Sequence, residues 1–111
     1  LVAAMTQPPE LVAGEGRACT NLMRAMGGKV AIKTGAEAFF VAIIPEKRLG
    51  VAVKIADGAT RASECAIAAI LVSLGVLDAN HPATGKYMNV PLLNRSKVAC
   101  GTIRPATELL F

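Results

Sequence analysis

The chain has 111 residues, of which 53% are hydrophobic and 18% are charged, and its net charge is +4. This length and composition are typical of a single unit, residues 1–111, with one core, and they exclude a disordered chain. The sequence contains no Trp, one Tyr and three Phe, and its basic residues are scattered. Few aromatic rings are available to stack on bases, and no basic cluster to bind phosphates, so no nucleic-acid partner is expected.

The cysteines and the apolar stretches bear on where the protein works. Cys19, Cys65 and Cys100 are far apart and form no Cys-x-x-Cys pair. This pattern predicts neither a disulfide framework nor a metal site in the chain, and it fits the reducing cytoplasm. The longest apolar stretch, residues 65–77, is shorter than the roughly 20 residues of a membrane-spanning helix, so no membrane association is expected. His81 stands alone in a polar segment, which favours an exposed loop residue over a ligand or a base.

The first predicted elements are a helix and a strand. Apolar side chains recur at the helical spacing i, i+3, i+4 and i+7 at Cys19, Leu22, Met23 and Met26. They predict a short helix over 19–26, stopped by the glycine pair that follows. Residues 29–33 alternate with a period of two, which predicts a strand with Lys33 on the face opposite Val30 and Ile32. This strand is expected to end at Lys33.

Two more strands are predicted next along the chain. Residues 39–44 are apolar at every position, which is typical of a strand that is covered on both faces. Residues 45–50 are polar at the centre and bounded by Pro and Gly, which favours a hairpin loop. The loop leads into a third strand over 51–56, so the three strands are expected to form an antiparallel sheet.

A long apolar helix is predicted after the sheet. It covers 60–75, with Thr60 as its N-cap, and apolar residues lie on nearly all its sides, so it should be buried against the sheet. Residues 78–94 show no clear element, and a short strand is predicted at 98–104. The predicted fold class is therefore α+β, an antiparallel sheet packed against a buried helix.

The tripeptide Lys33-Thr34-Gly35 is the feature that points most directly to chemistry. Lys-Thr-Gly is a signature element of the serine acyl-transferases that include β-lactamases and penicillin-binding proteins. A lysine can tune a serine hydroxyl or hold a carboxylate, a threonine can bond the same carboxylate, and glycine lets a substrate lie close. On the tripeptide alone, a surface lysine followed by a turn is an equally good interpretation.

The surrounding sequence resembles the L-asparaginase II family typified by rhizobial enzymes, which is related to serine β-lactamases and glutaminases. The similar stretches are Val12-Ala13-Gly14-Glu15-Gly16-Arg17, Thr20-Asn21-Leu22-Met23, Lys33-Thr34-Gly35-Ala36-Glu37, Val51-Ala52-Val53-Lys54-Ile55 with Asp57-Gly58 and Arg61, and Leu74-Gly75. Several such stretches in the same order are more specific than any one of them. The resemblance covers nearly the whole chain.

The resemblance implies a part of a β-lactamase-like fold that hydrolyses L-asparagine to L-aspartate and ammonia. It implies that Lys33 is the catalytic lysine that activates a serine, and that Thr34, Gly35 and Glu37 contact the substrate. The serine would belong to a Ser-x-x-Lys element, and this chain contains none. The chain is therefore expected to be the C-terminal portion of a larger asparaginase domain and inactive alone.

The same resemblance implies the partners and the cofactors. They are the N-terminal portion of the same protein, a second copy in a homodimer, and the substrate. Some relatives bind zinc through Cys and Lys ligands, which would lie in the N-terminal portion, so no metal is assigned to this chain. Two positions depart from the family's usual pattern: Ala38 stands where glycine is usual, and Cys19 stands where an acidic residue is common.

Two other functions remain open. A penicillin-interacting acyl-serine protein would use the same tripeptide, and a non-catalytic structural module of the same fold would fit the extra methyl group at Ala38. Single residues also have two interpretations. Glu37 either orients an ammonium group or forms a surface salt bridge, and Arg17 and Arg61 are expected to pair with carboxylates near helix starts.

Overall fold

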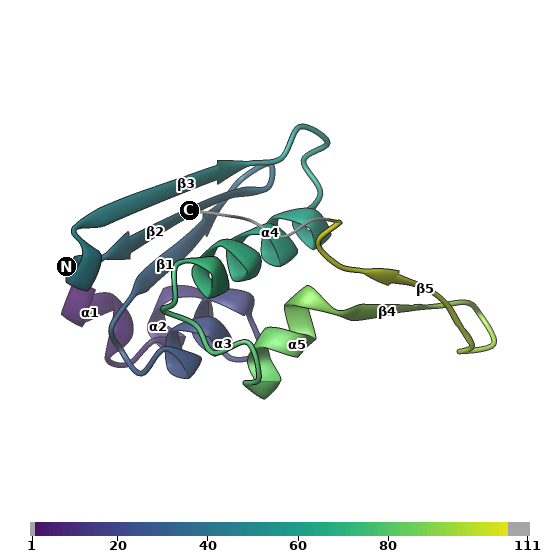
Figure 1. The fold of residues 1–111 in the computed structure, drawn as a ribbon, viewed down its shortest axis with the longest axis horizontal. Helices are drawn as coiled ribbons and strands as arrows, with labels where there is room; N and C mark the ends of the chain where they lie inside the picture. Colours follow the sequence, from purple (N-terminus) through teal and green to yellow (C-terminus); the bar gives the residue numbers. More distant parts are fainter. Residues whose placement is uncertain (1, 107–111) are drawn as a thin grey trace.

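A three-stranded antiparallel sheet organises the chain, and the computed structural model describes residues 2–106 (Figure 1). The strands β1 (Ala31–Gly35), β2 (Phe39–Ile44) and β3 (Leu49–Lys54) lie in the order β1-β2-β3, so β1 and β3 are both edge strands of this sheet. The helices α3 (Ala18–Ala25) and α4 (Thr60–Ser73) contact its inner face. This arrangement confirms the predicted α+β class.

The remaining elements lie at the two ends of the sequence. Two short helices, α1 (Val2–Thr6) and α2 (Glu10–Ala13), precede α3, and neither was predicted. After α4 come the helix α5 (Pro82–Met88) and a second, two-stranded antiparallel sheet, β4 (Val90–Leu93) with β5 (Ala99–Ile103). This hairpin projects away from the rest of the molecule (Figure 1). No helix within residues 2–106 is long and apolar enough to cross a membrane.

The core lies between the inner face of the sheet and the helices α3 and α4. The buried apolar residues alternate along β2, as the period of two requires, whereas the neighbours Ala31 and Ile32 are both buried in β1. The core cluster on these four elements contains Leu22 and Met23 of α3, Ile32 of β1, Phe40, Ala42 and Ile44 of β2, and Ile67, Ala68 and Leu71 of α4, with Val30 just before β1. The prediction that α4 is buried against the sheet is therefore confirmed.

The structure corrects the predicted limits of the strands. β1 runs two residues further than expected, so Thr34 and Gly35 lie inside it, paired with Phe40 and Phe39. Both residues are therefore in register with β2, and the turn comes only after Gly35. β3 likewise begins at Leu49, two residues early, because Pro45–Lys47 forms a single turn of 3-10 helix that already reverses the chain.

The prediction that β2 is covered on both faces is wrong. Phe39 and Ile43 are 37% and 36% exposed, whereas the alternate residues Phe40, Ala42 and Ile44 are buried. A continuous apolar run shows that both faces of a strand are apolar. It does not show that other parts of the chain pack against both faces. Within residues 2–106, only the inner face is covered along the length of β2.

Two further predictions about local structure are corrected. Thr60 is the first residue of α4 and not its N-cap, since the cap position is Ala59, whose N–H is bonded by the Asp57 carboxylate at 2.8 Å. The supposedly irregular stretch 78–94 contains α5 and β4. His81 caps α5, because its Nδ1 accepts a hydrogen bond from the Ala83 N–H at 3.1 Å.

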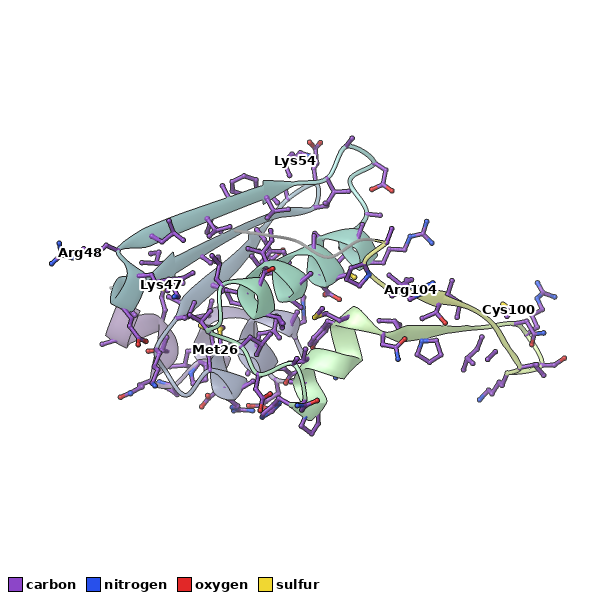
Figure 2. All side chains as sticks on the ribbon, in the orientation of Figure 1. Met26, Lys47, Arg48, Lys54, Cys100 and Arg104 are labelled. Atoms are coloured by element: carbon purple, nitrogen blue, oxygen red, sulfur yellow. The ribbon has the colours of Figure 1, made fainter. Side chains whose placement is uncertain are left out.

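A tight connection between β2 and β3 offers a test of backbone strain. Arg48 has a φ of +52°, in the left-handed region that disfavours a side chain, and it projects into solvent (Figure 2). Replacing Arg48 by Gly should raise the free energy of unfolding by about 0.5–1 kcal/mol in a urea titration. The neighbouring exposed Lys47 lies in the 3-10 turn, so Lys47→Gly should instead lower stability by about 0.5–1 kcal/mol. Equal effects of the two changes would contradict this account of the turn.

Candidate active site

The register of β1 on β2 decides which way each residue of the Lys-Thr-Gly tripeptide points. Lys33 lies opposite Val41 and Gly35 opposite Phe39, on the outer face of the sheet. Thr34 lies opposite the buried Phe40, so its side chain points to the inner face. The prediction that Lys33 points away from Val30 and Ile32 is confirmed, and the tripeptide presents its two polar side chains on opposite faces.

Lys33 is exposed, and its ammonium group is held only by its own strand. Its Nζ donates a hydrogen bond to the carbonyl oxygen of Thr34 at 2.5 Å. In the part of the chain that the structure describes, Lys33 forms no salt bridge with a carboxylate. A substrate or a second protein segment could therefore reach the ammonium group without displacing a charged partner.

Thr34 and Gly35 both have structural partners. The Thr34 hydroxyl donates a long hydrogen bond of 3.4 Å to the carbonyl oxygen of Phe39. A side chain at Gly35 would place its Cβ only 3.3 Å from the ring of Phe39, so the strand pairing itself favours glycine there. Thr34 and Gly35 thus take part in the packing of β1 on β2.

Glu37 lies in the turn that joins β1 to β2. It is exposed, and both Glu37 and Ala38 have a φ near +60°, at 60° and 58°. The Glu37 carbonyl oxygen accepts a hydrogen bond from Lys54 Nζ at 2.6 Å, whereas its carboxylate forms no salt bridge within residues 2–106. The turn is therefore fastened to β3 through backbone oxygen, and the carboxylate does not orient Lys33 here.

Cys19 is a contact of the tripeptide that sequence reasoning missed. The N–H of Thr34 donates to the Cys19 Sγ at 3.3 Å, and Cys19 is only 1% exposed. Burial raises the pKa of the thiol, an effect opposed by the Thr34 N–H and by the positive charges of Lys33 and Arg17. The helical spacing placed Cys19 on the buried side of α3, but no sequence pattern links it to a strand fifteen residues away.

Partly buried polar side chains lie on α3, α4 and α5: Asn21, Glu64 and Tyr87. Asn21 Nδ2 donates to the Tyr87 hydroxyl at 2.7 Å, across 66 residues of sequence. Burial raises the pKa of Glu64, while the charges of Arg17 and Lys86 lower it. The Asn21–Tyr87 hydrogen bond joins α5 to α3, the helix that carries Cys19.

The arginines are arranged differently from the prediction. Within residues 2–106, neither Arg17 nor Arg61 forms a salt bridge. Arg24 does so instead, with Glu10 and Glu15, and its guanidinium lowers the pKa of the Glu15 carboxyl. These side chains are exposed, so the bridges from α3 to α2 and to the turn after α2 contribute little to stability.

The three cysteines lie on three separate elements. Cys19 and Cys65 are buried on α3 and α4, and Cys100 is exposed on β5, where its Sγ contacts the Leu92 carbonyl oxygen at 3.3 Å (Figure 2). In the part of the chain that the structure describes, no group of three His, Cys, Asp or Glu side chains is placed to hold a metal ion. The donors within residues 2–106 are therefore not gathered into a zinc site.

The sequence was compared with models of known protein families. The model of the L-asparaginase II family matches residues 1–105. The chain belongs to the L-asparaginase II family. No curated protein matches it. Membership supports an asparaginase-type hydrolase and a small-molecule substrate in general terms, and the matched range includes both the tripeptide on β1 and Cys19.

The burial of the cysteines predicts how they react. In native protein, Cys100 should be alkylated by iodoacetamide at least tenfold faster than Cys19 and Cys65, because those thiols are buried and burial raises their pKa. Peptide mass spectrometry of samples quenched over time gives the three rates. In 6 M urea the rates should converge, and fast native labelling of Cys19 would contradict its enclosure between α3 and β1.

Proposed function

We propose that the protein is an L-asparaginase that hydrolyses L-asparagine to L-aspartate and ammonia through a serine acyl-enzyme, with Lys33 as the lysine that activates the serine. The observation that carries the proposal is the placement of Lys33, exposed on the outer face of an edge strand and joined to no carboxylate within residues 2–106. A lysine that takes a proton from a hydroxyl has to be within direct reach of it.

In the proposed reaction the Lys33 amine accepts the proton of the serine hydroxyl as its oxygen attacks the side-chain amide carbon of asparagine. The carbon–nitrogen bond breaks, and the leaving group takes the proton and departs as ammonia. Water then hydrolyses the ester, which releases aspartate and restores the serine. Thr34 and Gly35 line the substrate pocket along the strand edge, and Glu37 attracts the substrate's ammonium group from the adjoining turn.

The nucleophile has to come from outside these 111 residues, since none of the serines belongs to a Ser-x-x-Lys element. We propose that the chain is the C-terminal part of a larger domain, and that the N-terminal part carrying the serine covers the outer face of the sheet. The exposed Phe39 and Ile43 on that face support this, because side chains of this size on one sheet face are usually buried against something.

The rest of the proposal depends on the family resemblance. A homodimer in the cytoplasm is proposed as the working form, and the absence of any disulfide among Cys19, Cys65 and Cys100 is compatible with a reducing compartment. Any zinc ligands would belong to the N-terminal part, because the three thiols here are on separate elements.

A non-catalytic module of the same fold is the second candidate. The observation that favours it is Ala38, which is buried with a φ of +58°, a conformation that a methyl side chain disfavours. A side chain that strains the turn at the end of the Lys-Thr-Gly strand would fit a chain that keeps the fold without the activity.

The test is ammonia release from L-asparagine by the complete gene product. Lys33→Ala should lower kcat at least a hundredfold, the usual effect of losing a general base. Lys29→Ala is the matched control, because Lys29 is also exposed and precedes the same strand outside the tripeptide. Residues 1–111 alone should release no ammonia. Both variants should keep the parent's urea midpoint, so that a loss of rate is not a loss of fold.

Each other result has a defined meaning. A complete protein that is inactive on asparagine and glutamine but acylated by a penicillin would replace the amidohydrolase with the acyl-serine alternative. Inactivity on all three compounds would favour the non-catalytic module. An active parent with a fully active Lys33→Ala variant would show that the lysine has been assigned the wrong role.

A further inference from the structure

Cys19 lies where the open edge of the sheet meets a helix. β1 is an edge strand, so the backbone groups on its free side have no ladder partner in the three-stranded sheet. The N–H of Thr34 is one of these groups, and it donates to the Cys19 Sγ at 3.3 Å. The thiol is thus the hydrogen-bond acceptor for the central residue of Lys33-Thr34-Gly35.

We propose that Cys19 is a positioning residue, whose thiol holds the edge of β1 at Thr34 and thereby fixes the direction in which Lys33 presents its Nζ. The inference rests on the proposed function, since Lys33 is the group being positioned. Cys19 does not touch the substrate in this proposal. It acts through the backbone of the strand.

The geometry explains why one contact has this effect. Successive side chains of a strand point to opposite faces, so a slip of one residue would turn Lys33 into the core and Thr34 out of it. Edge strands resist such a change less well than central strands, because they are paired on one side only. The contact with Cys19 adds a second attachment, from a helix whose Leu22 and Met23 are fully buried in the core.

The burial of the thiol suits this role. Cys19 is 1% exposed, and burial raises the pKa of its thiol, which favours the neutral form as the acceptor. A thiol is also small and apolar enough to remain in the core next to Leu22. An apolar side chain of the same size would fill the space but leave the partly buried Thr34 N–H without this acceptor.

Three substitutions separate positioning from ordinary packing. Cys19→Ala removes the acceptor, and Cys19→Ser keeps one of similar reach. Cys65→Ala is the control, because it deletes the other buried thiol, which lies on α4 away from β1. All three are made in the complete protein. Two quantities are measured: the hydrogen-exchange rate of the Thr34 amide, and kcat and KM for ammonia release from L-asparagine.

The expected result is a Thr34 amide that exchanges at least tenfold faster in Cys19→Ala than in the parent, with most of the protection restored in Cys19→Ser. Cys19→Ala should also lower kcat at least tenfold, and Cys19→Ser should restore most of it. KM should change by less than threefold in both variants. Cys65→Ala should leave the Thr34 rate and kcat within threefold of the parent, even where its urea midpoint is lower.

The outcomes keep this inference apart from the proposed function. Equal Thr34 exchange in Cys19→Ala and the parent would overturn the positioning role, whatever the activity. Faster exchange with an unchanged kcat would also overturn it, because the strand would be held by Cys19 without effect on Lys33. If the parent releases no ammonia, the amidohydrolase proposal fails by itself, and the exchange rates then decide alone whether Cys19 holds the tripeptide.

Discussion

The burial of the inner face of the sheet against α3 and α4 is the interaction on which the candidate site depends. Ile32 and Phe40 are almost completely enclosed, and enclosing an apolar side chain of this size contributes about 1.5–3 kcal/mol. Once Ile32 is held inside, the period of two leaves Lys33 no direction except outward. The position of the lysine is therefore a consequence of core packing, and needs no ion pair to hold it.

Local patterns in the sequence were enough to predict the elements of the sheet and the direction of Lys33. The helical spacing of α3, the alternation before Lys33 and the apolar length of α4 are all signals within a dozen or so residues. What could not be predicted depends on distant residues. α5 has the composition of a loop, and the Asn21–Tyr87 hydrogen bond holds it across 66 residues. The His81 cap is its one local signal, because proline is common at the first position of a helix.

The same distinction applies to the site. The tripeptide and its family could be recognised because they are contiguous, whereas the contact of Cys19 with Thr34 joins a helix to a strand and has no local signature. The uncovered face of β2 was missed for a related reason: Phe39 and Ile43 have the same character as buried residues, and only tertiary structure shows that nothing in residues 2–106 covers them. An apolar sequence predicts that a sheet face tends to be buried, but it does not identify the segment or partner that buries it.

The opposite directions of Lys33 and Thr34 constrain how a substrate could use both. A ligand lying flat on the outer face would meet the ammonium group of Lys33 but not the Thr34 hydroxyl, which points inward. A ligand that contacts both side chains has to approach the free edge of β1, because the two faces of the sheet meet at that edge. At that edge Cys19 already accepts the Thr34 N–H, and the Thr34 carbonyl oxygen already accepts Lys33 Nζ at 2.5 Å. A group that binds Lys33 Nζ has to compete with this last hydrogen bond, whereas the bond to Cys19 uses the N–H of Thr34 and is not part of that competition.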